Sequence, residues 1–305
     1  MTSPLYAVGD IHGQSAMLDH ALDLIAADGG VDAPVVFLGD YTDRGPDSAG
    51  VLDRLIAGQA QGRPWITLKG NHDRMFEWFM EDTPRHDPHM LVGYHWFHER
   101  IGGIETLASY GVPVPDRIRL EDLHAQAKAE VPQAHADFLR GLDLYHQTDD
   151  LLFVHAGIDD HMAAQISAKG VAHVNRRFRK ESRKDPFVFY SGTIANLMRT
   201  KYRDVDHPLT ETGVDDLHLA GIRMLVQGHV NRHSGQELTS KHGLLHLEAD
   251  ITLDRHSRSS EGLEGIGTGA TIICPDGNIV GISRDYPHAK LFNPAHILQQ
   301  HGLSS

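Results

Sequence analysis

The stretch GDYTDRGPDS at residues 39–48 directly follows the apolar run APVVFL at residues 33–38. The apolar run predicts a buried strand, and the two glycines of the polar stretch supply the backbone freedom of a tight turn. Pro46 with Asp47 or Ser48 is typical of the start of a helix, where a short polar side chain caps the first turn. The other charged side chains of the stretch have no part in that helix start, so they are candidates for chemistry.

Two further segments repeat this arrangement of strand and polar turn, LYAVGDIHG at 5–13 and WITLKGNHD at 65–73. The interval from Asp10 to Asp40 is 30 residues and the interval from Asp40 to Asn71 is 31. Strands that alternate with helices at this spacing form parallel βαβ units. The expected strands span 5–8, 35–38 and 65–68, and the expected helices span about 16–27 and 49–60, with a third from near residue 73. Because ligands of such sheets bind beyond the carboxyl ends of the strands, the three polar motifs are expected to share one site.

The remainder of the chain is expected to complete one α/β domain over residues 1–305. Apolar and aromatic residues at helical spacing predict a helical cap insertion at about 74–148. Further strands are predicted at 151–157 and 222–229, each ending in a polar turn.

The C-terminal third has a different pattern. The segments 243–253 and 269–285 look like antiparallel strands, with a turn at 275–278. With the strands at 151–157 and 222–229 they suggest a second sheet packed against the first. The polar stretch 255–269 is expected to be a loop.

Composition excludes several classes of protein. The formal net charge of −13 argues against non-specific binding to nucleic acid or to an anionic membrane surface. No apolar stretch approaches the roughly 20 residues of a membrane span. The N-terminus lacks the pattern of a signal peptide, and Cys274, the single cysteine, cannot form an internal disulfide. These features fit a protein of the reducing cytoplasm.

Six side chains at the strand ends form a set of mixed oxygen and nitrogen ligands: Asp10, His12, Asp40, Asn71, His155 and His229. Carboxylate, imidazole and amide oxygen ligands suit Mn²⁺, Fe or Zn²⁺, and the lone cysteine argues against a sulfur site. With one aspartate as a bridge, such a set could hold two divalent metal ions about 3.5 to 4 Å apart, as two-metal hydrolases require. We expect Mn²⁺ first, with Fe or Zn²⁺ as alternatives.

The motifs GDIHG, GDYTDRG, GNHD, VHAG and GH occur in the order that is the signature of the calcineurin-like metallophosphoesterases, which this sequence therefore resembles. The DRG segment is similar to the phosphoprotein phosphatase branch, including its bacterial members. The resemblance implies a two-sheet αββα sandwich. It also implies that the first metal is held by Asp10, His12 and Asp40, and the second by Asp40, Asn71, His155 and His229.

The same resemblance implies roles for three further residues of the turns. His72 would protonate the leaving group, Asp43 would orient His72, and Arg44 would clamp the phosphoryl oxygens. A guanidinium offers two parallel donors to phosphate, which a lysine cannot reproduce.

The implied activity is hydrolysis of phosphomonoesters by attack of a metal-bridging hydroxide, with a phosphorylated protein side chain as the first-choice substrate. Asp73 stands where many protein phosphatases carry glutamate, and it keeps two alternatives open: a hydrolase of dinucleoside polyphosphates, or a phosphatase or phosphodiesterase of polynucleotide ends. A metal-binding scaffold without turnover is a distant alternative. The oligomeric state is not predicted.

A second phosphate-binding arginine is expected between the last two metal histidines. Arg203 is the choice, with Arg177 and Arg199 as competitors. The basic run at 175–184 is interpreted mainly as a solvated helix face. A cluster in the cap is interpreted as surface histidines around Trp96 and Phe97, and its members are His86, His89, His95 and His98.

Overall fold

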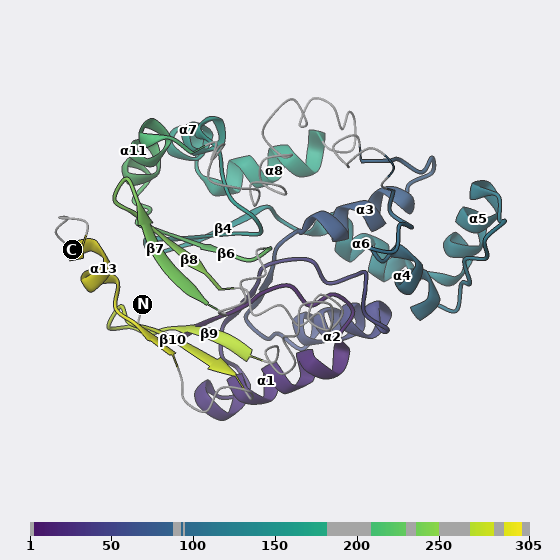
Figure 1. Cartoon of the computed structure of the whole chain (residues 1–305), viewed down its shortest axis with the longest axis horizontal. Helices are drawn as coiled ribbons and strands as arrows, with labels where there is room; N and C mark the ends of the chain where they lie inside the picture. Colours follow the sequence, from purple (N-terminus) through teal and green to yellow (C-terminus); the bar gives the residue numbers. More distant parts are fainter. Residues whose placement is uncertain are drawn as a thin grey trace.

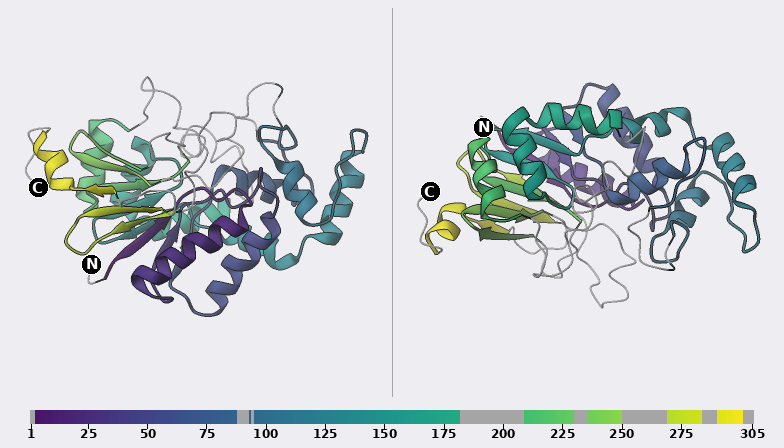
Figure 2. Two further views of the ribbon diagram at one scale, coloured as in Figure 1. Left: turned by 60° about the horizontal axis from the view of Figure 1, so that its bottom comes forward. Right: turned by 90° about the horizontal axis from the view of Figure 1, so that it is seen from above.

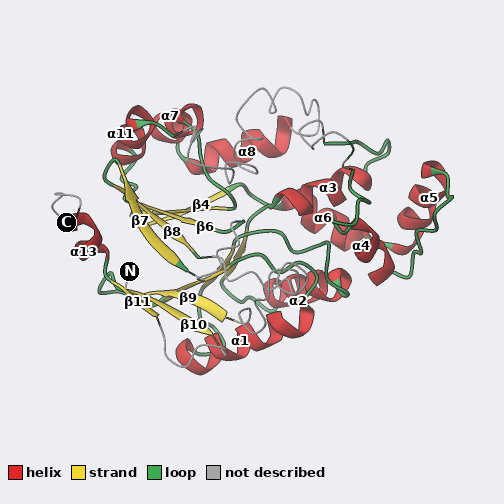
Figure 3. Ribbon diagram, in the orientation of Figure 1, coloured by secondary structure: helices red, strands yellow, loops and turns green. Residues whose placement is uncertain are grey.

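The computed structural model describes residues 3–87, 93, 95–181, 209–229, 236–249, 269–283 and 290–300. Two mixed sheets lie face to face with helices on their outer sides (Figure 1). This arrangement confirms the expected two-sheet α/β sandwich. Figure 3 separates the two strand layers from the helices that cover them.

The first sheet contains the three predicted parallel strands at its centre and one edge. They are β1 (Leu5–Val8), β2 (Val35–Phe37) and β3 (Trp65–Thr67). The connecting helices are α1 (Ser15–Gly29) and α2 (Ser48–Ala60). Asp47 caps α2 by accepting a hydrogen bond from the Gly50 N–H at 2.9 Å, so the predicted helix start is confirmed.

The C-terminal strands complete this same sheet, on the free side of β1. They are β9 (Gly269–Ile273), β10 (Ile279–Ser283) and β11 (Lys290–Phe292), in the order β11-β10-β9-β1-β2-β3. The prediction that 269–285 belongs to the second sheet was therefore wrong, although the antiparallel pairing was right. The physical reason is that β1 would otherwise leave one row of backbone groups unpaired, and β9 satisfies them.

The second sheet has the order β4-β5-β6-β8-β7. Its strands are β4 (Tyr145–Thr148), β5 (Leu151–Val154), β6 (Met224–Gln227), β7 (Glu237–Lys241) and β8 (Leu244–Glu248). Strands β5, β6 and β8 are parallel, whereas β4 and β7 run antiparallel at the edges. β4 falls inside the segment predicted to be helical, because its short alternating pattern is hard to distinguish from a helix end.

Apolar side chains from both sheets fill the space between them, among them Ala7, Val36, Phe153, Val226 and Leu247. The outer face of the second sheet is covered by α7 (Asp160–Lys169), α8 (Val171–Glu181) and α11 (Glu211–Leu219). A last helix, α13 (Pro294–Gln300), lies at the opposite end of the molecule from the helices of residues 103–141 (Figure 1).

Four helices extend beyond the sheets at one end of the molecule, as the views of Figure 2 agree. They are α3 (Asn71–Phe79), α4 (Gly103–Ser109), α5 (Leu120–Glu130) and α6 (Gln133–Gly141), and the segment 74–144, which holds most of them, is called the cap below. Among the described residues, no helix is long and apolar enough to span a bilayer.

Candidate metal and phosphate site

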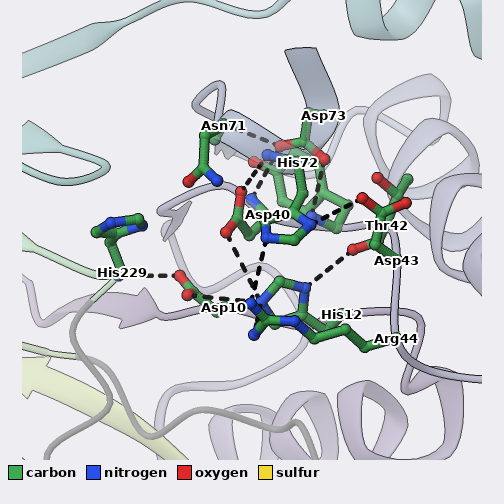
Figure 4. A network of polar contacts seen from close by, with 12 residues as sticks. Asp10, His12, Asp40, Thr42, Asp43, Arg44, Asn71, His72, Asp73 and His229 are labelled. Carbon is green, nitrogen blue, oxygen red and sulfur yellow. Dashed lines mark hydrogen bonds and ion pairs between the residues drawn. The ribbon is translucent and has the colours of Figure 1, made fainter. Parts of the chain in front are cut away.

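The polar turns after β1 and β2 are joined by backbone hydrogen bonds, and the turn after β3 packs closely against them. The N–H groups of Ile11 and His12 both donate to the Asp40 carbonyl, at 3.0 and 2.8 Å. Gly39 has φ +108°, and a Cβ there would lie 2.6 Å from the Gly70 nitrogen, so the turns approach more closely than a side chain allows. The side chains of these turns consequently converge on one point (Figure 4).

Asp73 connects the turns after β2 and β3 through its carboxylate. Its buried carboxylate accepts hydrogen bonds from the N–H groups of Asp40 at 2.8 Å, Tyr41 at 2.9 Å and Gly70 at 2.9 Å. The residue is 0% exposed. Asp73 therefore holds the second and third turns together, and its carboxylate has no surface with which to select a substrate.

Several site residues adopt a left-handed backbone conformation that is uncommon for residues other than glycine. The φ angles are +46° at His12, +53° at Asp40, +72° at Asp43, +66° at Arg44 and +66° at His229. Such conformations cost about 1 to 3 kcal/mol each and persist where the surrounding structure enforces them, which is a common property of active sites.

Two histidines are oriented by backbone carbonyl groups. His12 Nδ1–H donates to the Thr42 carbonyl at 2.9 Å, and His155 Nδ1–H donates to the Leu38 carbonyl at 2.9 Å. Because a carbonyl can only accept, the Nε2 atom of each neutral ring carries a lone pair toward the centre of the site. Metal-binding histidines are typically held in this way.

Oxygen acceptors lie near both lone pairs, together with an Arg44 nitrogen 3.0 Å from His12 Nε2 and His229 Nδ1 3.0 Å from His155 Nε2. His12 Nε2 lies 3.8 Å from an Asp10 carboxylate oxygen and 3.7 Å from one of Asp40. His155 Nε2 lies 3.5 Å from Asp40 Oδ1 and 3.0 Å from Asn71 Oδ1. Acceptors that face one another repel unless a cation lies between them, so the donor set fits divalent metal ions.

The geometry brings all six expected ligands into one region. Asp40, His155 and His229 have ligand atoms within 4.8 Å of one another, and so do His12, Asp40 and His72. Asp40 belongs to both groups, as expected for a bridging ligand. Asp10 lies beside them, and its carboxylate accepts the backbone N–H of His229 at 3.0 Å.

Burial raises the pKa of the Asp40 carboxyl well above its usual range, and the nearby charge of Asp73 raises it further. Hydrogen bonding by the His72 N–H and the charge of Arg44 oppose this shift. A divalent cation would favour the ionised carboxylate in the same way as Arg44, and more strongly.

A second feature is a buried pair formed by His72 and Asp43. His72 Nδ1–H donates to Asp43 Oδ2 at 2.7 Å. Burial raises the pKa of Asp43 to about 7, while hydrogen bonds from Thr106 and Trp96 and the charge of Arg44 lower it. The sequence patterns did not point to Thr106 as a partner of Asp43, and they identified Trp96 only as a residue surrounded by the surface histidines.

Arg44 places its guanidinium between His12 and His72. Its two terminal nitrogens lie 3.0 Å from His12 Nε2 and 3.3 Å from His72 Nε2 (Figure 4). Its backbone N–H donates to the carbonyl of Gly102, a cap residue with φ +90° whose absent Cβ would lie 2.2 Å from the Arg44 nitrogen. The guanidinium is thus fixed beside both the candidate metal ligands and the His72–Asp43 pair.

The remaining predictions concern residues away from this centre. Arg203 and Arg199 lie outside the described residues, and Arg177 is exposed on α8. Arg176 and Lys180 are also exposed on that helix, in keeping with a solvated face.

The cap histidines lie at the surface where they are described. His86 and His95 are exposed and His98 is partly buried, whereas His89 lies outside the described residues. The rings of His95 and His98 are 6.3 Å apart at their centroids. The stretch 255–268 also lies outside the described residues.

The chain is similar to proteins of known families. Residues 3–230 match the calcineurin-like phosphoesterase family. A symmetrical bis(5'-nucleosyl)-tetraphosphatase from Paracidovorax citrulli is 31% identical over 178 residues, which are 58% of this chain and 52% of that protein. The enzyme of the same name from Ralstonia nicotianae is 41% identical over 70 residues, 23% of each chain.

The chain spans about half the length or less of these curated relatives. Among solved structures, a cold-active protein-tyrosine phosphatase from a psychrophilic Shewanella superposes with a TM-score of 0.61 at 17% identity. The superposition covers 96% of this chain and 81% of that one, and it supports the fold.

Proposed function

The chain belongs to the calcineurin-like phosphoesterases, and from this premise we propose that it hydrolyses phosphomonoesters with alkyl leaving groups, of which phosphoserine and phosphothreonine side chains are examples. As a member of that family it is a metal-dependent hydrolase of phosphoric esters. The observation that carries the proposed substrate class is the buried His72–Asp43 pair at 2.7 Å.

The chemical reason lies in the leaving group. An alkoxide is a strong base and leaves slowly unless it receives a proton, so a positioned general acid contributes about 10² to 10⁴ in rate. The leaving group of a dinucleoside polyphosphate is a nucleotide phosphate, a much weaker base that gains less from protonation. A protonated His72 held by Asp43 is therefore best suited to an alkyl phosphate.

Each of the other side chains has a place in the same reaction. When bound by Asp10, His12, Asp40, Asn71, His155 and His229, two divalent metal ions would supply an activated water and neutralise charge on the phosphoryl group. Arg44 would orient the phosphoryl oxygens through its paired N–H donors. Asp43 would stabilise the charged form of His72.

Hydrolysis of dinucleoside tetraphosphates is the second candidate. It is favoured by three curated relatives that carry that activity in their names, at 31%, 41% and 33% identity. Asp73, the residue that kept this alternative open, is fully committed to backbone N–H groups and gives it no added support.

Substrate preference tests the proposal. The values of kcat/KM would be measured with Mn²⁺ on a phosphoserine peptide, p-nitrophenyl phosphate, bis-p-nitrophenyl phosphate and diadenosine tetraphosphate. We expect the phosphopeptide to be turned over with a higher kcat/KM than diadenosine tetraphosphate. A preference of about tenfold or more for the dinucleotide, equivalent to about 1.4 kcal/mol, would overturn the proposed substrate class.

A His72→Asn variant tests the proposed acid. We expect its kcat to fall by about 100-fold or more on the phosphoserine peptide but much less on p-nitrophenyl phosphate, whose leaving group needs little protonation. His161→Asn, a substitution at an exposed position on α7, serves as the matched control and should retain full activity. Equal losses on the two substrates would exclude His72 as the acid.

A further inference from the structure

The carboxylate of Asp43 is held by two residues of the cap as well as by His72. Trp96 Nε1–H donates to both carboxylate oxygens, at 3.0 and 2.9 Å. Thr106 Oγ1–H donates to Oδ1 at 2.7 Å and in turn accepts the Asp43 N–H at 2.8 Å. Both donors come from more than 50 residues further along the chain, 53 for Trp96 and 63 for Thr106.

Trp96 is fixed by the same helix that carries His72. Its ring stacks on Phe76 with a centroid distance of 5.3 Å and an interplanar angle of 18°, and it lies 4.9 Å from the ring of Phe79. Phe76 follows His72 by four residues on α3, so the two side chains lie on one face of that helix. The indole is also confined by Gly103, where a Cβ would lie 2.6 Å from the ring.

These contacts form a closed network of interactions. His72 donates to Asp43, Asp43 accepts from Trp96, and Trp96 packs on the helix of His72. A carboxylate with fixed donors on both sides keeps a single orientation, because any rotation would break hydrogen bonds in a buried site. The direction in which the Asp43 oxygen faces His72 is consequently set by the cap.

We propose that Trp96 and Thr106 are positioning residues for the general acid: they hold Asp43 so that His72 stays aimed at the leaving-group oxygen. The inference rests on the proposed role of His72 and extends it to two residues of the cap. Small displacements of a catalytic group are costly in rate, so loss of either donor slows proton transfer while leaving the metal ligands in place.

Trp96→Phe removes the indole donor and keeps an aromatic ring, and Thr106→Val removes the hydroxyl, which is donor to Oδ1 and acceptor of the Asp43 N–H, with little change of shape. They would be assayed as the Mn²⁺-loaded protein at saturating substrate, on a phosphoserine peptide and on p-nitrophenyl phosphate. We expect kcat on the phosphopeptide to fall about tenfold in each variant, and kcat on p-nitrophenyl phosphate to change by less than about twofold. Thr106→Ser, which keeps the hydroxyl, should remain close to the wild type on both substrates.

Trp78→Phe is the matched control. This buried tryptophan of α3 lies against the Arg74 guanidinium, whose carbon is 4.8 Å from the Trp78 ring centroid, and it is not part of the network of His72, Asp43 and Trp96. Its kcat ratio between the two substrates should equal that of the wild type. Thermal unfolding would verify that each variant is folded. If Trp96→Phe does not fold, Thr106→Val still tests the inference independently.

Equal losses on both substrates, or no loss on either, would overturn the inference. His72→Asn is measured beside these variants to separate two kinds of failure. If His72→Asn discriminates between the substrates and the cap variants do not, only the positioning role is wrong. If His72→Asn shows no discrimination, the acid itself is misassigned and the positioning role falls with it.

Discussion

At the scale of one residue, burial of Asp43 disfavours the ionised carboxylate that its proposed role requires. The residue is 0% exposed, and burial raises its pKa to about 7 despite hydrogen bonds from Thr106 and Trp96 and the charge of Arg44, which lower it. A folded-state pKa above the unfolded value of 3.8 means that the neutral form is favoured by folding. The ionised carboxylate therefore costs stability, and its benefit lies in holding His72.

The variant Asp43→Asn separates the pH dependence of stability that is due to Asp43 from that of the other titratable groups. Since the stabilising contribution of neutral Asp43 is present below about pH 4 and is lost as pH rises toward 7, Asp43→Asn should gain stability relative to the wild type over that window. The gain should be on the order of a few kcal/mol, measured by calorimetric unfolding of the metal-free proteins between pH 5 and 8. A difference between the two proteins that does not vary with pH would contradict the assigned pKa.

The residue scale also marks where sequence reasoning reaches its limit. Asp10, Asp40 and Asn71 were predictable as neighbours because each follows an apolar strand at a regular interval, and parallel strands end at one edge. No comparable regularity connects Asp43 to Trp96 or Thr106, which meet it only through the packing of the cap. Such contacts depend on tertiary structure and leave no local pattern.

At the scale of elements, the first turn of α3 connects the parts of the site. It supplies Asn71 and His72, and through the Asp73 carboxylate it accepts hydrogen bonds from N–H groups of the turn after β2. The strands and helices around it were predictable from apolar runs and Gly-containing turns. The placement of β9 beside β1 was not, because the choice of a strand partner is not encoded in the strand's own pattern.

Removing the Asp73 carboxylate should destabilise the fold and weaken metal binding. Asp73→Ala leaves three buried N–H groups without their acceptor, so we expect a loss of about 2 to 4 kcal/mol in the free energy of unfolding and a weaker affinity for Mn²⁺. Chemical denaturation and calorimetric titration would measure the two effects. Asp82→Ala, on an exposed side chain just after α3, should change stability by less than about 0.5 kcal/mol.

At the scale of the whole molecule, the candidate metal site joins the two sheets. Asp10, Asp40 and Asn71 follow strands of the first sheet, whereas His155 and His229 follow β5 and β6 of the second. Bound metal ions would therefore connect the two layers as well as supply chemistry. The two sheets and the division of the ligands between them could be predicted from the sequence, whereas the sheet to which β9 and β10 belong could not.

Metal binding should accordingly stabilise the entire fold. Mn²⁺ at about 100 times its Kd should stabilise the native protein by about 2.7 kcal/mol, because it binds the folded state alone. His155→Asn should reduce the increase of Tm that Mn²⁺ produces, while His161→Asn, exposed on α7, should leave it unchanged. An equal increase of Tm in the wild type and in His155→Asn would remove His155 from the ligand set.

The most direct test of the central claim is the dependence of phosphoserine-peptide hydrolysis on metal. The purified chain would be treated with EDTA, dialysed and assayed while Mn²⁺ is added back in measured amounts. We predict that activity disappears with the metal and returns in full as two Mn²⁺ ions bind per chain. Hydrolysis that continues undiminished in EDTA would contradict the claim.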